Sequence, residues 1–337
     1  MCSSFSPRCG VNVASIAHRF CTLVRYGVTI EAAIFRVRIM STNNELQSLY
    51  QTQVSFPQAT EHAVATVLLD GEYEDQYWFV ADTTPFHPVS HLWPDHPADR
   101  GMVSVGKEEI PVIDCQVGAV NTESGEVQIG RAITARRGEP DWVFVVIHRV
   151  NQPILSGASI VLKVDKGYQD SLSRGHTAGH LASIALNKVL ADGYWRKEAE
   201  RRDPIGSPDF NSYAQQASSV TEDRCEDTYR LGKTLRKRGL NAADMVSDLQ
   251  EIERRVNQQL KNWLSMPTAV TLRCEGAGLT DSRYWQCELH NDGLAVMPCG
   301  GTHVSHLSTY ESITVSLLLD DPQQIKMVTI AKGRKSF

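Results

Sequence analysis

The sequence predicts an α+β fold, with a small N-terminal β-barrel domain followed by an α+β domain. Short segments rich in β-branched and aromatic residues, separated by glycines, fill the chain from about residue 63 to residue 150. Helical periodicity of the apolar residues begins only after residue 150, where it alternates with further strand-like segments. We therefore expect an extension or misassigned start at 1–40, a barrel domain at 41–150 and an α+β domain at 151–337.

Length and composition are those of a globular protein with a hydrophobic core. The chain has 337 residues, of which 42% are hydrophobic and 22% are charged, close to ordinary globular usage. No apolar run reaches the ~18–20 residues of a membrane-spanning helix, so no membrane is expected among the partners. The net charge of −5 argues against a protein covered by nucleic acid, but it is compatible with a local basic patch.

The cysteines and the N-terminal segment both bear on the cellular compartment. Eight cysteines are scattered along the chain, unlike a disulfide framework, and this favours a reducing compartment. The first forty residues hold five arginines, one acidic residue and no lysine. This composition fits either an organellar transit peptide or a translated upstream stretch. We favour a functional start at Met40 and a cytoplasmic protein; a mitochondrial protein is expected if residues 1–39 are a transit peptide.

The first part of the chain predicts short strands joined by glycine-containing turns. A His- and Pro-rich stretch, Phe86–Pro97, has no periodicity and is expected to be a loop. The regular strand spacing indicates a small β-barrel or sandwich, and we expect the barrel. The predicted strands are Ala63–Leu69, Tyr77–Ala81, Ile110–Cys115, Val127–Ile129 and Trp142–Val150.

The second part predicts two helices among further strands. Apolar residues recur at helical spacing from His176 up to Gly193, and again from Asn241, a candidate N-cap, to Trp263. Between them, Tyr194–Ser219 is polar and interrupted by prolines, as expected for a long insertion. The predicted strands are Ile160–Val164, Ala269–Cys274, Trp285–Leu289, Ile313–Leu319 and Met327–Ile330.

Two short motifs have the spacing of metal ligands. His176 and His180 are four residues apart on a predicted helix, so both side chains lie on one face. Cys299 and His303 flank two glycines, which permit a tight turn that brings them together. Either motif alone is weak, because paired histidines often lie on a solvated helix face. Together they supply one thiolate and three imidazoles, a ligand set that suits zinc.

Both motifs resemble the second additional domain of alanyl-tRNA synthetases, and especially the free-standing alanyl-tRNA editing proteins of the AlaX type. The stretch Cys-Gly-Gly-Thr-His-Val, from Cys299 to Val304, is similar to that family's signature. Upstream, the segment from Asp82 to Gly101 resembles the N-terminal barrel segment of the longer editing proteins. The resemblance implies a barrel domain followed by a zinc-dependent editing domain, related also to that of threonyl-tRNA synthetases. It implies mischarged tRNA, bound by its acceptor end, as the partner.

The sequence departs from the family pattern in three places. The family's Gly-Gly-Gly-Gln motif is absent, and Trp93-Pro94-Asp95-His96 stands in its place. The residue before the second zinc histidine is usually a threonine that helps to recognise a seryl hydroxyl, whereas here it is Gly179. The insertion Tyr194–Ser219 is also longer than the family norm. These departures leave the edited amino acid and tRNA open.

Thr177, Gly179 and Thr302 are the candidate catalytic residues, because they adjoin the candidate zinc ligands. The threonines are placed to hydrogen-bond to substrate or ligands, or only to cap local backbone. Zinc with an exchangeable position lowers the pKa of bound water to ~7 and supplies a nucleophile for ester hydrolysis. Four protein ligands are instead typical of closed structural sites. The ligand set alone leaves these alternatives open.

A basic run and a group of histidines lie outside the zinc motifs. Arg230, Lys233, Arg236, Lys237 and Arg238 fall within nine residues and are the candidate tRNA-binding residues, although such a run is also typical of a solvated face. His87, His91 and His96 lack regular ligand spacing, so we expect a binding or structural loop. His148 lies in an apolar strand and is expected to be a core histidine with its hydrogen bonds satisfied.

The function that the sequence predicts is zinc-dependent trans-editing without ATP. The protein would hydrolyse the ester of a mischarged tRNA, with seryl- or glycyl-tRNA(Ala) as the expected substrate. Two alternatives come from other classes: an RNA-binding module with a structural zinc, and a metal-dependent hydrolase of a small ester or amide. The sequence does not predict an oligomeric state.

Overall fold

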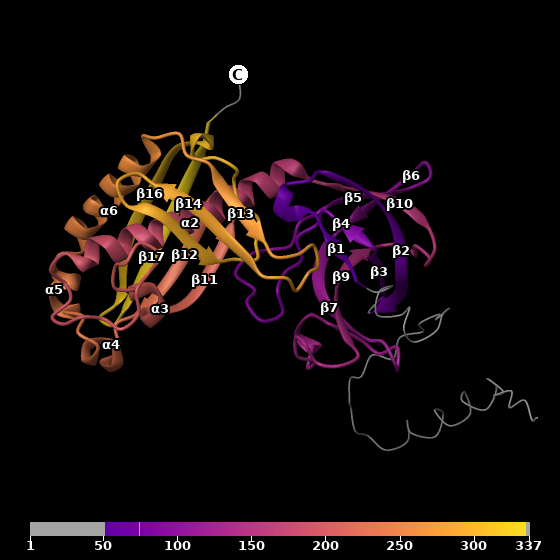
Figure 1. Ribbon diagram of the computed structural model, residues 1–337, viewed down its shortest axis with the longest axis horizontal. Helices are drawn as coiled ribbons and strands as arrows, with labels where there is room; N and C mark the ends of the chain where they lie inside the picture. The colour runs from indigo at the N-terminus through magenta and orange to yellow at the C-terminus, as the bar shows by residue number, and fades with distance from the viewer. Residues whose placement is uncertain (1–50, 74, 335–337) are drawn as a thin grey trace, which may run out of the picture. The chain divides into compact units, whose positions relative to one another are not determined.

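The computed structural model describes residues 51–73 and 75–334 (Figure 1). These described residues belong to one compact unit. The extension predicted at 1–40 and the start predicted at Met40 lie outside the described residues. Strands dominate the first part of the described chain, and helices appear with further strands in the second, as the predicted α+β class requires. None of the described helices is long and apolar enough to cross a membrane.

The first part forms an eight-stranded antiparallel sheet with the strand order β6-β5-β10-β2-β3-β9-β7-β8. The edge strands β6 and β8 do not pair with each other in the described chain, so the predicted closed barrel is not confirmed. β10 follows the predicted domain boundary at residue 150 but pairs with β2 and β5, which extends this sheet to Val164. The division into domains stays a prediction. The strands are β2 (His62–Tyr73), β3 (Gln76–Ala81), β5 (Gly101–Val105), β6 (Glu108–Val112), β7 (Asp114–Asn121), β8 (Val127–Ile129), β9 (Trp142–Val150) and β10 (Ser159–Val164).

Alternating side chains explain how this sheet buries one face. In β10 the buried residues are Ile160, Leu162 and Val164, and the residues between them are exposed. This period of two places every second side chain on the core face. The predicted strand Ile110–Cys115 is in fact the end of β6 and the beginning of β7. A short parallel pair, β1 (Gln53–Val54) and β4 (Thr83–Thr84), forms a separate two-stranded sheet.

His148 in β9 is the core histidine that the sequence predicts. It is fully buried, its Nε2 lies 2.7 Å from the Thr84 hydroxyl, and its Nδ1 lies 3.4 Å from the Phe79 carbonyl. The ring also stacks on Phe79 at 4.7 Å between centroids. Burial lowers the pKa of His148 to about 4, so the ring is neutral near pH 7.

The second part is built around α2 (Lys166–Ala191). We predicted that this helix begins at His176, but it begins ten residues earlier, at Lys166. The Asp165 side chain caps it by accepting from the Tyr168 amide. The first turns of α2 were not predicted from the spacing of apolar residues, because the buried residues there include the polar Gln169, Ser171 and Ser173. This longer helix crosses the second part (Figure 1), and His176 and His180 lie near its middle.

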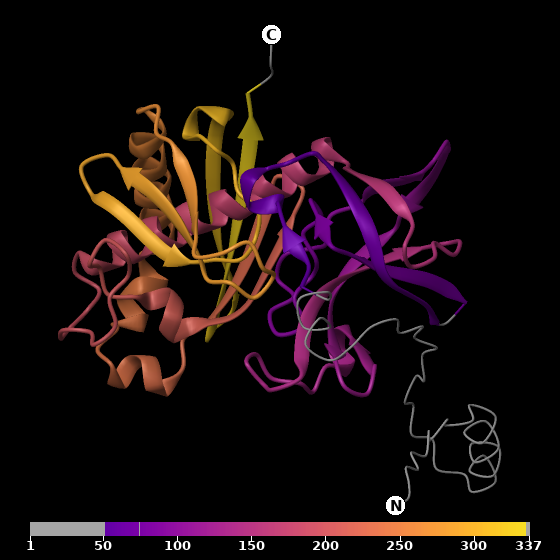
Figure 2. The ribbon, with the colours of Figure 1, turned by 45° about the vertical axis from the view of Figure 1, so that its right-hand side comes forward.

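α2 lies between a four-stranded sheet of order β11-β12-β17-β16 and a three-stranded sheet of order β13-β14-β15 (Figure 2). A second long helix, α6 (Leu249–Leu264), packs against α2 and β16. The remaining helices are α3 (Phe210–Ala214), α4 (Lys233–Lys237) and α5 (Ala242–Ser247). The strands are β11 (Gln215–Thr221), β12 (Arg224–Arg230), β13 (Val270–Cys274), β14 (Arg283–Leu289), β15 (Gly293–Pro298), β16 (Tyr310–Asp321) and β17 (Gln324–Gly333).

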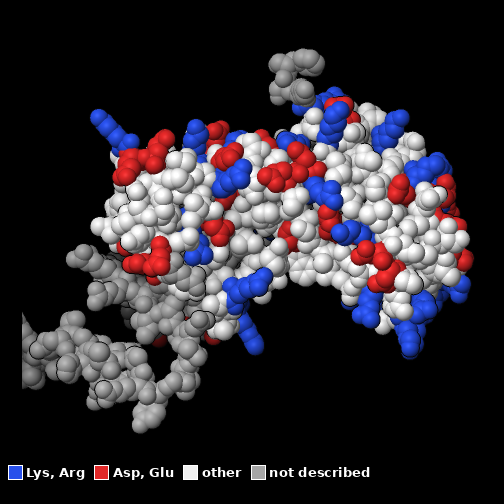
Figure 3. Space-filling model, turned by 180° about the vertical axis from the view of Figure 1, so that it is seen from behind, with Lys and Arg blue, Asp and Glu red and all other residues white. Residues whose placement is uncertain are grey.

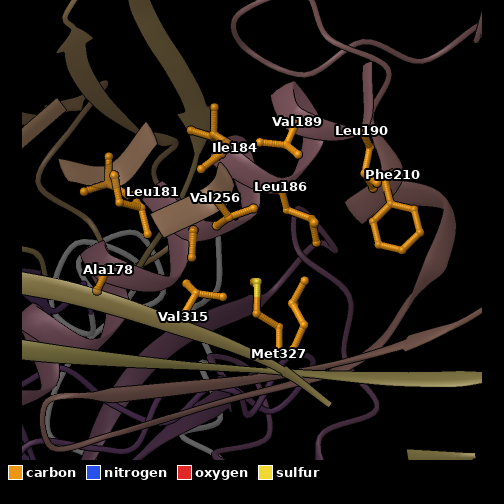
Figure 4. Close-up of a cluster of buried hydrophobic side chains, with 14 of the residues drawn as sticks. Ala178, Leu181, Ile184, Leu186, Val189, Leu190, Phe210, Val256, Val315 and Met327 are labelled. Atoms are coloured by element: carbon orange, nitrogen blue, oxygen red, sulfur yellow. The ribbon is translucent and has the colours of Figure 1, made fainter. Parts of the chain in front are cut away.

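The core of this part joins α2 to the four-stranded sheet and to α6. Figure 4 shows Leu181 and Ile184 of α2 near Val256 of α6, with Val315 and Met327 of the sheet facing them. Complete burial of one such side chain contributes about 1.5–3 kcal/mol to folding. The middle of α2 is therefore held on several sides, which fixes the direction of the histidines that it carries.

Two predictions for the second part need correction. The helix predicted from Asn241 to Trp263 is two helices, α5 and α6, separated at Asp248. The polar insertion predicted at Tyr194–Ser219 ends in structure, since Phe210–Ala214 is α3 and β11 begins at Gln215. Three strands were missed altogether, namely β11, β12 and β15.

Candidate metal centre

Two of the four candidate ligands come from the middle of α2. His176 and His180 are one helical turn apart, and their Nε2 atoms lie 3.1 Å from each other. His176 is buried, while His180 is partly exposed. Because both residues occupy one face of a helix whose other faces are packed, the two imidazoles aim at the same point.

The other two ligands come from the loop that follows β15. The Cys299 amide donates to the Arg283 carbonyl over 3.0 Å, which fixes the start of the loop against β14. The Cys299 Sγ lies 3.2 Å from His303 Nε2, 3.5 Å from His176 Nε2 and 3.6 Å from His180 Nε2. All four ligand atoms lie within 4.8 Å of one another, so the predicted convergence of the two motifs is confirmed.

The residues around the ligands also suit a metal site. The His303 Nδ1 lies 3.0 Å from the Thr177 hydroxyl, and the His176 Nδ1 donates to the Thr302 carbonyl over 3.1 Å. These contacts leave the Nε2 atoms free to face the common point, as the outer contacts of metal-bound histidines do. One thiolate with three imidazoles is a donor set that zinc accepts. The four side chains, which we call the metal cluster, therefore fit a zinc ion.

Burial controls the protonation of the metal cluster. Burial lowers the pKa of His176, and the neighbouring His303 and His180 lower it further. Burial lowers the pKa of His180 to about 4. Imidazoles with such low pKa values are neutral near pH 7, the form that donates a lone pair to a metal. Burial raises the pKa of the Cys299 thiol to about 12, a shift that a cation held at this point would oppose.

The two threonines predicted beside the site lie behind the ligands. Thr177 is fully buried, and its hydroxyl accepts from the Val304 amide besides contacting His303. Thr302 is buried as well, and its hydroxyl accepts from Ser173 over 2.9 Å. Neither residue borders the cavity described next. Both threonines thus hold ligands or backbone in place.

A cavity of about 710 Å³ opens beside the metal cluster and is bordered by His176, His180 and Cys299. Gly179 forms part of its wall, next to the β12 residue Cys225. A Cβ added at Gly179 would lie 2.7 Å from the Cys225 Sγ. Glycine at this position therefore follows from the close approach of α2 to β12, as well as leaving the cavity wide.

Two carboxylates border the same cavity. The Asp227 carboxylate accepts from the Gln215 amide over 2.7 Å and lies 3.6 Å from the Cys225 Sγ. Asp95 comes from the His- and Pro-rich loop, and its carbonyl accepts from the Val220 amide over 2.7 Å. Burial raises the pKa of Asp95 to about 6, and the nearby Asp227 contributes to the shift. Sequence analysis missed both residues, because an isolated aspartate carries no spacing signal.

The predicted loop of histidines is packed beside the metal cluster. We call His87, His91 and His96 the loop histidines. The His96 ring lies 4.9 Å from the His176 ring, and its Nε2 lies 3.3 Å from the Thr302 hydroxyl. The loop histidines do not form a second metal-binding group within the described residues, so their ordered packing agrees with the predicted binding or structural loop.

The candidate tRNA-binding residues lie on α4 and beside it. Arg230, Lys233, Arg236 and Lys237 are exposed, and blue side chains gather at this end of the molecule in Figure 3. Arg238 is already engaged, because it pairs with Glu200 at 3.1 Å and lies over the Tyr213 ring. None of these residues borders the cavity beside the metal cluster.

Comparison with known proteins connects this geometry to one kind of protein. No family model matches the chain. The chain is 24% identical over 271 residues to an alanine–tRNA ligase of Halorubrum lacusprofundi, a match that covers 80% of this chain and 24% of the ligase. It is 25% identical over 225 residues to that of Thermotoga petrophila, covering 63% and 22% of the two chains. It is 23% identical over 260 residues to that of Methanopyrus kandleri, covering 76% and 23%. Over most of its length, the chain is therefore similar to about a quarter of the length of alanine–tRNA ligases.

Proposed function

We propose that this protein is a zinc-dependent hydrolase that removes a wrong amino acid from tRNA, in the manner of free-standing editing proteins of the AlaX type. Its substrate would be the acceptor end of a mischarged tRNA, with seryl- or glycyl-tRNA(Ala) favoured. Similarity to alanine–tRNA ligases supports a link to alanine tRNA. The observation that carries the hydrolytic part is the convergence of four zinc-type ligands beside a large cavity.

Zinc bound by the metal cluster would polarise an ester carbonyl or a bound water. The chain's own residues prepare this chemistry. Thr177 and the Thr302 carbonyl hold the imidazoles of His303 and His176 in one orientation. In the net reaction, water adds to the ester carbonyl carbon, and the carbon–oxygen bond to the ribose breaks. The ribose oxygen leaves as a hydroxyl, the amino acid leaves as a carboxylate, and one proton is released to the solvent.

The carboxylates beside Gly179 suit the amino-acid half of such a substrate. An aminoacyl ester carries an ammonium group, which is attracted by Asp227 and Asp95 on the cavity wall. Gly179 offers no hydroxyl to a seryl side chain, so we propose a roomy site that accepts serine and glycine. An apolar pocket discriminates by only ~10–200-fold for each methylene, whereas a hydroxyl contact reaches ~10⁴-fold or more. We therefore expect alanine to be spared mainly through weak binding.

Adding the missing threonine is a poor test of this idea. The Cβ of Gly179→Thr would meet the Cys225 Sγ at 2.7 Å, so the variant disturbs packing as well as recognition. The unmodified protein gives the cleaner result. If it already prefers seryl- over alanyl-tRNA(Ala) by ~10⁴-fold, another group supplies the hydroxyl contact and the assignment of Gly179 is wrong.

A structural zinc is the second candidate, favoured by the number of ligands. Four protein side chains converge here, which is the composition of closed structural sites. In that case the protein would bind RNA without turnover. The exposed basic residues on and beside α4 would serve either function, as proposed contacts for tRNA phosphates.

A deacylation assay separates the two candidates. The zinc-loaded full chain is mixed with seryl-, glycyl- and alanyl-tRNA(Ala) and with other mischarged tRNAs, and the released amino acid is measured. We expect release from seryl- and glycyl-tRNA(Ala) and its loss in Cys299→Ala. Cys274→Ser is the matched control, because Cys274 is a free thiol that does not border the cavity. Zinc binding without release of any amino acid would overturn the hydrolase and leave the structural zinc.

A further inference from the structure

A buried arginine with incomplete hydrogen bonding lies in the wall of the cavity. Arg283 is only 7% exposed. Its guanidinium donates to the carbonyls of Leu279 and Gly278 over 3.1 and 2.6 Å. Its Nε finds no acceptor, and no carboxylate pairs with it within the described residues. Because buried polar groups are normally hydrogen-bonded, a buried guanidinium that borders a cavity and has a donor without an acceptor indicates a place where an anion could complete its contacts.

Two further arginines border the same cavity from the loop before β9. Arg136 and Arg137 are exposed, and neither forms an ion pair within the described chain. Glu139 lies nearby in sequence, but its carboxylate caps the turn by accepting from the Arg136 amide over 2.8 Å. Burial lowers the pKa of Arg283, the nearby Cys274 and Asp281 raise it, and the charge of Arg137 lowers it. The charge of Arg137 therefore reaches Arg283 across the cavity wall.

The cavity wall also presents an exposed aromatic side chain. Trp93 is 59% exposed, although tryptophan is among the residues that proteins bury most. It comes from the same loop as the loop histidines and borders the cavity with Arg136 and Arg137. An exposed ring beside basic groups is typical of proteins that bind single-stranded nucleic acid, where bases stack and phosphates meet arginines.

We propose that Arg136, Arg137 and Arg283 bind backbone phosphates of a single-stranded RNA 3′ end, and that one of its bases stacks on Trp93. The inference rests on the proposed function, because these contacts would hold the RNA so that its aminoacylated end lies at the metal cluster. A series of side-chain contacts connects Arg283 to the metal cluster. Arg283 lies over the Phe56 ring, Phe56 meets His87 at 5.1 Å, and His87 meets His96 at 4.4 Å. His96 in turn lies against His176.

Guanidinium groups bind phosphate well, since their planar donors match its oxygens, as they also match those of a carboxylate. A free phosphate would satisfy the arginines but would gain nothing from Trp93. An RNA strand uses both features, and this favours RNA as the occupant. The basic residues on and beside α4 do not border the cavity, so they are available only to a longer RNA that also carries a stem.

The test uses uncharged RNA and therefore does not depend on turnover. The zinc-loaded full chain is titrated against a fluorescent single strand that ends in CCA, and the Kd is measured by anisotropy at several salt concentrations. Arg136→Gln with Arg137→Gln should reduce the magnitude of the log Kd–log salt slope by about 1.4, because each phosphate contact on a single strand contributes about 0.7. Trp93→Ala should weaken binding about fivefold or more and leave the slope unchanged.

The matched control is Lys107→Gln with Lys261→Gln. It removes the same two positive charges from exposed positions that do not border the cavity, so its slope should equal that of the unmodified protein. Inorganic phosphate at millimolar concentration should compete only weakly; complete displacement of the strand by phosphate, with no effect of Trp93→Ala, would overturn the assignment to RNA. Equal slopes for the arginine variant and the control would overturn the arginine site. RNA binding with no hydrolysis of any charged tRNA would support this inference and overturn only the proposed hydrolase.

Discussion

Two groups of wholly or partly buried histidines lie side by side in this protein, and they differ in what their ring nitrogens face. In the metal cluster, the Nε2 atoms and the Cys299 Sγ face one another within 4.8 Å. In the loop histidines, the Nδ1 atoms of His87 and His96 both face the Pro97 carbonyl, at 3.4 and 2.8 Å. Burial lowers the pKa of His87 and of His96, as it does in the metal cluster, so burial and low pKa do not distinguish a ligand from a packed ring. The convergence of the unprotonated nitrogens on one point is what distinguishes a metal ligand from a packed ring.

The largest expected effect comes from removing a converging atom. Cys299→Ala takes away the one thiolate of the metal cluster, and we expect zinc affinity to fall by more than about 100-fold, the upper range for losing a mere outer contact. His87→Gln, in a loop histidine, should keep one zinc per chain. Elemental analysis after dialysis measures both. Equal loss of zinc in the two variants would show that the two groups are one site.

The next effect concerns a buried histidine that has no metal to face. The pKa of His148 is lowered by burial from its ordinary value near 6.5 to about 4, so the unfolded chain binds more protons between these values. The contribution of His148 to the free energy of unfolding should therefore be constant above pH 6.5 and fall by about 3 kcal/mol as the pH drops to 4. His148→Phe should remove this part of the pH dependence. Urea unfolding from pH 7.5 to 4 measures it, and parallel curves for the two proteins would contradict the assignment.

The smallest effect is expected where the two groups of histidines meet. A Cβ added at Gly301 would lie 2.5 Å from His176 Cε1 and 3.2 Å from His96 Cδ2. Gly301→Ala should thus destabilise the fold by about 1–3 kcal/mol through overpacking, and it should weaken zinc binding. Gly300→Ala is the adjacent control, because a Cβ there meets nothing within 4 Å. Thermal unfolding with and without zinc compares them; identical behaviour would mean that the loop yields freely.

The sequence reveals the metal cluster because ligand spacing is a local signal. The geometry of these ligands can be predicted without knowledge of the fold. Two of them are four residues apart on a helix, and the other two flank a pair of glycines. β12 was missed for the opposite reason. Its buried face is Cys225, Asp227 and Tyr229, and a buried aspartate breaks the apolar alternation that predicts a strand. The contacts with Gln215 and Cys225, which depend on the folded structure, explain that aspartate.

The roles of Arg283 and Gly179 could not be predicted for a related reason. Each depends on what lies opposite it in space: an open cavity for Arg283 and the Cys225 sulfur for Gly179. The closed barrel illustrates a different limit. Strand spacing predicts that strands exist, but whether the first and last strands of a sheet meet depends on twist and register, which short motifs do not encode.

The ligands of the metal cluster are divided between near and distant parts of the chain. His176 and His180 come together as soon as α2 forms, whereas Cys299 lies 119 residues beyond His180 and 123 beyond His176. Closing so long a loop costs chain entropy before any contact repays it. During synthesis, almost the entire second part of the chain must therefore be made after His176 and His180 before Cys299 and His303 are present. A zinc ion that bridged both ends would bind the closed loop in preference to the open chain, and by mass action it would stabilise the fold in proportion to the logarithm of its free concentration. Zinc occupancy would then report that the two ends of this long loop have been brought together.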